Sequence, residues 1–235
     1  MKRKLLLITG LLLFLMGCDN YYMMCSLNPF YVEKNITIEP RIEGKWMAKI
    51  ALPANDKGSP FDSKIWGTAD TALTWTIKRD IRKDVVKDKK GADSTIFKPE
   101  NYYIARLTHL ADSINFEFKV VLFRVNKGLY ADFIPNNKEE LLKSKLATNS
   151  FFELHTLARV IVNDHQIKLS WLGADCMKDM IEKKRVRVNY QFVKEANRFI
   201  LSASSSDLTG MIERYADQPR FIDWENQKAQ LKLTN

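Results

Sequence analysis

The sequence contains 235 residues, of which 46% are hydrophobic and 11% aromatic, and its formal net charge is +9 at pH 7. This apolar content is sufficient for a hydrophobic core and excludes a mostly disordered chain, and the length fits one large domain or two small ones. The basic excess permits attraction to anionic lipid headgroups or glycans. Because the basic residues are scattered among acids, the charge is more typical of an ordinary soluble surface, and no nucleic acid is expected as a partner.

The first 17 residues have the three parts of a secretory signal peptide. A positive start at residues 2–4 precedes an apolar run from Leu5 to Met16, and the small residue Gly17 follows. The run is too short to span a bilayer comfortably, since spanning takes roughly 20 apolar residues. The segment therefore predicts export of the chain.

The stretch Leu15-Met16-Gly17-Cys18 resembles the lipobox of bacterial lipoproteins. The resemblance implies cleavage between Gly17 and Cys18 and acylation of Cys18, with palmitate as the expected modification. It also implies a lipoprotein anchored to a membrane of the bacterial cell envelope. Asp19 is similar to an inner-membrane retention signal of some bacteria, but the membrane and the leaflet stay open. The alternatives are an ordinary signal peptide followed by an incidental cysteine, and an uncleaved anchor.

We predict three segments: a signal peptide at 1–17, a lipidated N-terminus and tether at 18–40, and a single β-rich domain at 41–235. Removal of the signal leaves 218 of the 235 residues and a charge of about +6, because the signal holds three basic residues and no acid. The tether contains side chains that are unusual in a flexible linker: Tyr21, Tyr22, Met23, Met24, Phe30 and Tyr31. We expect them to pack on the domain or to rest in the lipid headgroup region.

The β pattern begins near residue 42, where apolar and polar side chains alternate. A strand at 46–52 carries Trp46 on its apolar face, and a strand at 72–78 carries Trp75. A polar loop at 53–63 separates them. A charged hairpin loop, which includes the lysine-rich cluster at 87–90, then leads to a strand at 102–107.

The longest predicted strand is 114–125, which carries Phe116 and Phe118 on its first face. Its second face changes from polar to apolar toward Val125, which indicates a sheet that is covered at one end. Asn126-Lys127-Gly128 is typical of a tight turn and leads to a partner strand at 129–134. Residues 136–146 predict a short helix or an ordered loop.

The C-terminal half predicts a hairpin, two helices and three more strands. Strands at 156–162 and 167–172 flank a turn at 163–166. A helix capped by Asp175 runs to about Lys184, and a second helix runs from Asp207 to Tyr215. Strands at 186–193, 199–203 and 229–233 complete the pattern.

About ten short strands joined by hairpins predict a mainly β fold, either an antiparallel, lipocalin-like barrel or a sandwich. Two short helices and an N-terminal signal helix accompany the strands. Gly44-Lys45-Trp46 resembles the Gly-x-Trp of lipocalins, whose tryptophan closes the base of the barrel. The other lipocalin motifs are missing.

A longer series of motifs is similar to a group of uncharacterised bacterial lipoproteins. It includes Cys25 with Asn28-Pro29-Phe30-Tyr31, Gly44-x-Trp46, Tyr130-Ala131-Asp132-Phe133-Ile134-Pro135, His155-Thr156-Leu157, Leu169-Ser170-Trp171-Leu172 and Leu201-Ser202-Ala203-Ser204. This resemblance implies an order of elements and an architecture. It assigns no activity and no catalytic residue.

The sequence predicts no catalytic, metal or cofactor site. Gly-x-Ser-x-Gly, Walker, His-Glu-x-x-His and dinucleotide motifs do not occur. The histidines lack a second ligand at a helical or strand offset, so we interpret them as hydrogen-bonded side chains: His109, His155 and His165. Four aspartates are interpreted as turn residues: Asp112, Asp132, Asp164 and Asp175. A pair of them acting as acid and base stays open.

Two alternatives also stay open for the remaining cysteines. Cys25 and Cys176 form a disulfide in an oxidising envelope, or they remain two buried thiols. Cys176 lies beside Asp175 with no identifiable base, which is more typical of an inert thiol than of a nucleophile.

Aromatic side chains on the apolar faces form the candidate interior pocket: Trp46, Trp75, Phe118 and Trp171. In a small barrel such rings either fill the centre or line a ligand pocket. The expected function is binding, interaction or assembly within the envelope. The expected partners are the membrane, through the N-terminal lipid, and an envelope protein or an apolar ligand. The alternatives are a lipocalin-like carrier of a small apolar ligand and an envelope hydrolase, and a non-enzymatic role is favoured.

We expect a radiolabelled fatty acid to enter the wild-type protein and not the Cys18→Ala variant, because the thiol is the acylation site that the lipobox implies. Metabolic labelling followed by gel electrophoresis measures this. Label that persists in the variant, or that enters neither protein, would contradict acylation at Cys18. Replacing Gly17 by a bulky residue should block processing and leave the longer precursor.

Overall fold

The computed structural model describes residues 24–50, 73–87, 93–109, 115–136, 154–193, 198–217 and 228–234. The predicted signal peptide, the acylation site Cys18, the loop at 53–63 and most of the segment predicted at 136–146 lie outside these ranges. Among the described residues no helix combines the length and apolar character needed to cross a membrane.

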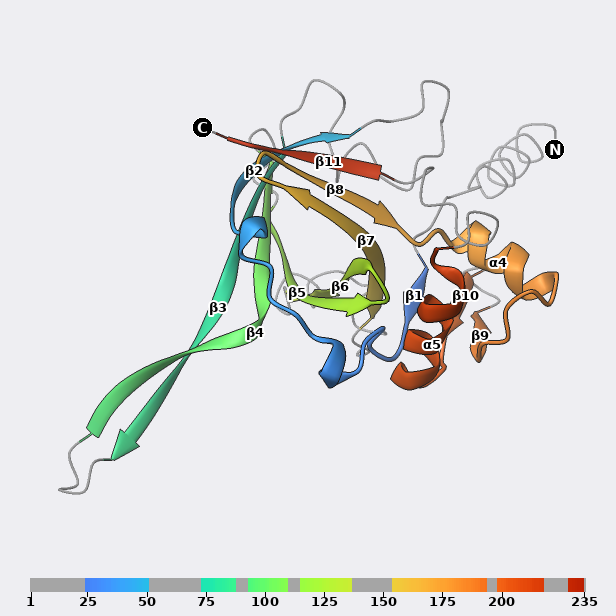
Figure 1. Ribbon diagram of the computed structural model, residues 1–235, viewed down its shortest axis with the longest axis horizontal. Helices are drawn as coiled ribbons and strands as arrows, with labels where there is room; N and C mark the ends of the chain where they lie inside the picture. Colours follow the sequence, from blue (N-terminus) through green and yellow to red (C-terminus); the bar gives the residue numbers. More distant parts are fainter. Residues whose placement is uncertain are drawn as a thin grey trace, which may run out of the picture.

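Eight strands form a closed antiparallel barrel (Figure 1). They are β2 (Gly44–Ile50), β3 (Leu73–Lys87), β4 (Asp93–His109), β5 (Asn115–Val125), β6 (Gly128–Pro135), β7 (His155–Asn163), β8 (Gln166–Trp171) and β11 (Lys228–Leu233). Each of the strands β2 to β7 pairs with the next one, and the β6–β7 pairing curls the sheet. The C-terminal strand β11 lies between β2 and β8 and completes the ring. The predicted lipocalin-like barrel is therefore confirmed.

The alternation of side chains puts one apolar set inside the barrel, because successive residues of a strand point to opposite faces. Trp46 on β2 lies opposite Trp75 on β3, and Trp75 lies opposite Leu107 on β4. All three are buried in one cluster together with Trp171. Trp46 Nε1 donates a hydrogen bond of 2.9 Å to the carbonyl of Ile42, the last residue of the short 3-10 helix η2 (Pro40–Ile42).

A second layer covers the outer face of β5, β6 and β7. It contains β1 (Cys25–Ser26), the 3-10 helix η1 (Glu33–Asn35), α4 (Ala174–Glu182), β9 (Tyr190–Val193), β10 (Arg198–Leu201) and α5 (Ser205–Tyr215). Its second hydrophobic cluster combines Phe123 and Tyr130 of the barrel with Leu208 and Ile212 of α5. This layer explains why the second face of β5 becomes apolar toward Val125, as the sequence indicated.

The N-terminal segment runs along the barrel from Met24 to Ile42. The Thr37 amide donates to the carbonyl of Leu122 at 2.9 Å, and the Glu39 amide donates to the Tyr103 hydroxyl at 2.9 Å. The hydrogen bond from Arg41 lowers the pKa of Glu39. The ionised Glu39 side chain forms an ion pair with Arg41. From Met24 onward, the segment predicted as a tether is part of the packed domain.

β1 gives the sheet its single parallel pairing among the described strands. Cys25 lies opposite Ile200 of β10 in parallel and opposite Thr156 of β7 in antiparallel orientation. Through this bridge, β10 and β9 extend the sheet beyond the barrel. The antiparallel prediction holds for the barrel but not for this extension.

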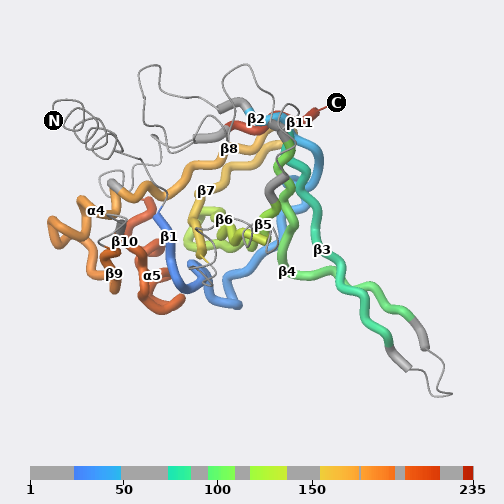
Figure 2. Tube along the Cα trace, turned by 180° about the vertical axis from the view of Figure 1, so that it is seen from behind, coloured from blue at the N-terminus to red at the C-terminus, as the bar shows by residue number. Residues whose placement is uncertain are grey.

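Both predicted helices form, with shifted ends. Helix α4 begins after Gly173, so Asp175 lies in its first turn and is not the N-cap as predicted. Helix α5 begins two residues earlier than predicted, because the Ser204 hydroxyl caps it by accepting the Asp207 amide at 3.2 Å. Both helices lie at one end of the molecule, outside the barrel (Figure 2).

The β3–β4 hairpin differs most from the prediction. Residues 79–101 were expected as a charged hairpin loop, but β3 continues to Lys87 and β4 begins at Asp93. The two strands continue to pair with each other beyond the point where β2 and β5 stop pairing with them. They form a ribbon that projects far from the barrel, on the side opposite to α4 and α5 (Figures 1 and 2). Opposite charges pair with each other on the two strands, so a charged segment can form a ribbon. Composition alone did not indicate this pairing.

We expect Trp46→Ala to lower the free energy of unfolding by about 3–5 kcal/mol, because it removes a buried ring from a packed core. Met47→Ala is the matched control, since Met47 is 40% exposed on the other face of the same strand. This control should change stability by about 1 kcal/mol or less. Urea denaturation of both variants measures the difference, and similar losses would contradict the packing of Trp46.

Candidate functional site

The candidate interior pocket is filled by its own side chains. Trp46, Trp75 and Trp171 are buried, and Phe118 is partly buried against the same cluster. The ring of Phe133 lies among them, with its centroid 6.2 Å from Trp75 and from Phe118, and 5.9 Å from Trp171.

Among the described residues, a cavity of about 20 Å³ lies between apolar side chains inside the barrel. A cavity of this size holds about one water molecule, whereas pockets for small organic ligands measure about 300–1,000 Å³. The aromatic side chains were expected either to fill the barrel or to line a ligand pocket. In the part of the barrel that the structure describes, they fill it.

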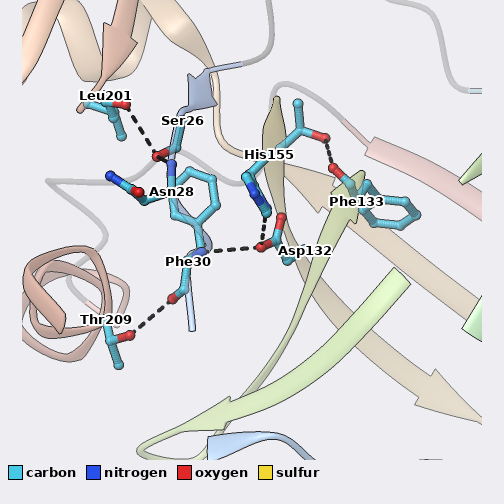
Figure 3. A network of polar contacts seen from close by, with 9 residues as sticks. Ser26, Asn28, Phe30, Asp132, Phe133, His155, Leu201 and Thr209 are labelled. Atoms are coloured by element: carbon cyan, nitrogen blue, oxygen red, sulfur yellow. Dashed lines mark hydrogen bonds and ion pairs between the residues drawn. The ribbon is translucent and has the colours of Figure 1, made fainter. Parts of the chain in front are cut away.

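A buried polar network lies between the barrel wall and the second layer (Figure 3). Asp132 on β6 and His155 at the start of β7 are 0% and 4% exposed. His155 Nδ1 lies 2.8 Å from Asp132 Oδ2, and the same oxygen accepts the amide of Phe30 at 3.2 Å. The single hydroxyl proton of Thr209 on α5 is shared between the carbonyl of Phe30 at 3.1 Å and that of Ser205 at 2.8 Å. Asp132 thus connects the barrel, the N-terminal segment and α5.

Burial dominates the electrostatics of this network. It raises the pKa of Asp132 above its ordinary value of 3.8, and the hydrogen bond from His155 opposes this shift. Among the described residues, the other carboxyl oxygen of Asp132 is buried with no hydrogen-bond partner. A buried acceptor of this kind costs free energy, which the two bonds to Oδ2 offset.

An Asp–His pair also occurs in hydrolytic sites, where a nucleophile adjoins the imidazole. Here the nearby Ser26 hydroxyl is buried and donates to the carbonyl of Leu201 at 3.3 Å. Within the described ranges, no group of three or more His, Cys, Asp or Glu side chains is arranged to hold a metal ion. The geometry assigns the pair a role in joining the two layers.

Sequence reasoning placed Asp132 beside a turn, and this was wrong, because Asp132 lies within β6 opposite Leu157 of β7. An aspartate inside an otherwise apolar strand was the signal that could have identified it. The interpretation of His155 as a hydrogen-bonded side chain is confirmed. Asp132 and His155 are 23 residues apart, and only the pairing of β6 with β7 brings them together.

The other candidate residues lie apart from this network. His165 and Asp164 are in the β7–β8 turn, where the His165 amide donates to the Asn163 side chain at 3.1 Å. His109 ends β4 opposite Leu73. Cys25 and Cys176 are not joined by a disulfide, and both are partly exposed. Asp112 lies outside the described residues, as does Cys18.

The projecting ribbon is a second candidate site. We define the β3–β4 arm as residues 81–87 and 93–99, which pair with each other beyond the barrel. At its root the register shifts between Arg79 and Ile81, and such a bulge bends a ribbon. The Tyr102 hydroxyl donates to Asp80 at 2.6 Å, and this bond raises the pKa of Tyr102 to about 12. Arg79 also bonds the carbonyl of Glu100 at 2.7 Å. These contacts fix the direction in which the arm leaves the barrel.

The two faces of the β3–β4 arm differ in character. Cross-strand register places one set of exposed side chains together, namely Ile81, Lys83, Val85, Thr95, Phe97 and Pro99. Ile81, Val85 and Phe97 are 59%, 63% and 67% exposed. On the opposite face, Arg82 and Lys98 form ion pairs with Asp84 at 2.9 and 3.2 Å. The first set, which we call the apolar arm face, contains one cation and no acid.

No family model, no curated protein and no solved structure matches this chain. The pairing of its strands nevertheless defines a class: a closed, eight-stranded, lipocalin-like barrel with a second layer and a projecting arm.

We expect Asp132→Ala to destabilise the fold more than Asp132→Asn. Alanine leaves the Phe30 amide and the His155 ring without their acceptor, at about 1–3 kcal/mol for each unsatisfied buried group. Asparagine retains a carbonyl oxygen that accepts the Phe30 amide.

The same variants have an expected pH dependence. The pKa of Asp132 is higher in the folded protein than its ordinary value of 3.8. As the pH rises above 3.8, this carboxyl therefore loses its proton more readily in the unfolded chain than in the folded one. The free energy of unfolding falls over that range. The amide of the Asp132→Asn variant does not titrate, so any stability advantage of the wild type over this variant should shrink over that range. Urea denaturation across a pH series measures this, and an advantage that grows with pH would contradict it.

Proposed function

We propose that this chain is an envelope lipoprotein, anchored to a membrane through Cys18, which binds another envelope protein through the apolar arm face. The observation that carries the binding role is the exposure of Ile81, Val85 and Phe97 together on a ribbon that projects from the barrel. A two-stranded ribbon alone is marginally stable in water, and an apolar face on it is unfavourable unless a partner covers it.

The chemistry of the apolar arm face describes the partner. Phe97 and its apolar neighbours require a hydrophobic groove of comparable width. Lys83 lies opposite Phe97 in the register, so the groove should offer a carboxylate beside its apolar floor. The other face also carries Ile96, which is 41% exposed, but Ile96 lies opposite Asp84, the partner of Arg82 and Lys98. The apolar arm face therefore has the larger set of exposed apolar side chains.

The filled interior supports an outward role over the carrier alternative. A small apolar ligand needs a volume that the described part of the barrel does not provide, since the cavity there is about 20 Å³. The hydrolase alternative would require a reactive group in an open cleft. Asp132 and His155 lie beneath the second layer instead.

A photo-reactive amino acid at position 97 of the full-length protein tests the proposal in cells. We expect one discrete cross-linked protein from position 97 and none from position 98, because these neighbours lie on opposite faces of the arm. Lys83→Glu should reduce the cross-link several-fold through charge repulsion, whereas Lys98→Glu, as the matched control, should not. Both residues are exposed, and Lys98→Glu also removes the ion pair with Asp84, so stability should change by about 1 kcal/mol or less in each variant.

Equal cross-linking from positions 97 and 98 would indicate non-specific contact and contradict the proposal. The complete lack of a cross-link at position 97, in a protein that reaches the membrane, would also contradict it. An adduct with a second copy of this chain would replace the proposed partner by a homodimer.

A further inference from the structure

The surface next to β1 combines exposed aromatic rings with a series of cations. Tyr190 and Phe192 on β9 are 43% and 48% exposed. Their ring centroids lie 5.1 and 4.9 Å from that of Phe199 on β10. The three rings continue the second hydrophobic cluster outward into solvent, since Phe199 packs against that cluster. We call these rings, together with the cations described next, the β9 surface.

Four exposed cations lie between α4 and β9: Lys183, Lys184, Arg185 and Arg187. In the stretch 182–193 the sequence has one acid, Glu182. Lys183 bonds Asp179 within its own helix, and the other three cations follow the helix end. Cations that directly precede a strand with exposed aromatic rings match the chemistry of an anionic bilayer surface, where rings occupy the headgroup level and cations attract phosphate.

The end of α4 supports this assignment by its backbone. The Lys184 and Arg185 amides donate to the carbonyls of Ile181 and Met180, and Lys184 has a φ of 53°. This is a Schellman motif, in which glycine is the preferred residue at the left-handed position. A lysine there imposes strain, and such strain is typical of functional positions. The side chains of Lys184 and Arg185, which follow this helix end, are exposed to solvent.

The described chain begins close to the β9 surface. Cys18, the proposed acylation site, precedes Cys25 by seven residues, which span at most about 25 Å when extended. Cys25 lies beside Ile200 on β10, and β10 pairs with β9. The described chain therefore begins next to the β9 surface, while the β3–β4 arm lies at the opposite end of the molecule (Figures 1 and 2).

We propose that the β9 surface rests on the anionic headgroups of the membrane that holds the lipid anchor. This inference depends on the proposed acylation of Cys18. Two contacts, the acyl chains and the β9 surface, then orient the domain and direct the arm away from the bilayer. A tether alone would leave the orientation of the barrel undefined.

The test uses the full-length lipidated protein in vesicles that contain anionic phosphatidylglycerol and lipids with brominated acyl chains. Tyr190→Trp adds a fluorophore to the β9 surface, and Phe97→Trp adds one to the arm as the matched aromatic control. The native tryptophans give the baseline, which the wild-type protein measures. We expect bromine to reduce the added emission of Tyr190→Trp several-fold and to leave that of Phe97→Trp unchanged.

Charge is tested by a variant that should not damage the fold. Lys184→Gly relieves the left-handed strain, so it should raise the thermal midpoint while it weakens quenching of Tyr190→Trp in anionic vesicles. Quenching should also fall in high salt and in zwitterionic vesicles, because screening and loss of lipid charge remove the attraction.

Flotation of the vesicles separates the two proposals. Protein that floats with vesicles but shows no quenching of Tyr190→Trp would overturn the β9 surface assignment and leave the anchor intact. Equal quenching of both variants would overturn the orientation. Protein that does not float would overturn both the anchor and the surface contact.

Discussion

The packing of Trp46, Trp75 and Trp171 inside the ring of strands is the interaction on which the rest of the structure depends. These rings come from β2, β3 and β8, and β11 joins β2 to β8, so burial of the rings and closure of the sheet require each other. A closed barrel has no free edge within its ring, which removes one route to aggregation. A filled barrel also has no room for a ligand in its described interior. The candidate binding surfaces therefore lie on the outside of the barrel.

The outer surface is divided between two ends. At one end the second layer buries the outer faces of β5 and β6 and brings the start of the described chain beside β10. Asp132 stabilises this arrangement because it bonds both the N-terminal segment and β7 through one carboxylate oxygen. At the other end, the bulge after Arg79 aims the β3–β4 arm outward. The start of the described chain and the proposed binding face thus lie at opposite ends of the molecule.

Much of the fold could be predicted from the sequence, because period-two alternation reports which strand face is buried. The alternation at Trp46, Trp75 and Trp171 identified the interior rings, and the apolar change along β5 indicated a covering layer. The predicted helix at 207–215 also forms as α5, with its cap at Ser204. Each of these features depends on residues close together in the chain.

The features that were missed depend on long-range pairing. Charged residues at 79–101 suggested a loop, since composition does not show that Arg82 and Lys98 share Asp84 across two strands. The Asp132–His155 pair forms only because β6 lies beside β7. The helix cap at Gly173 has no side chain, so Asp175 was a reasonable but wrong choice. Tertiary contacts decided the arm and the Asp132–His155 pair, because both depend on residues that are distant in the chain.

Native mass spectrometry of the protein purified from membranes tests the central claim most directly, namely that a filled barrel acts through its surface while a lipid holds it. The account predicts the mass of residues 18–235 plus covalent acyl groups on Cys18, with the same mass under native and denaturing conditions. A small apolar molecule that is present in the native spectrum and lost on denaturation would contradict it, because the interior would then have to open to hold a ligand.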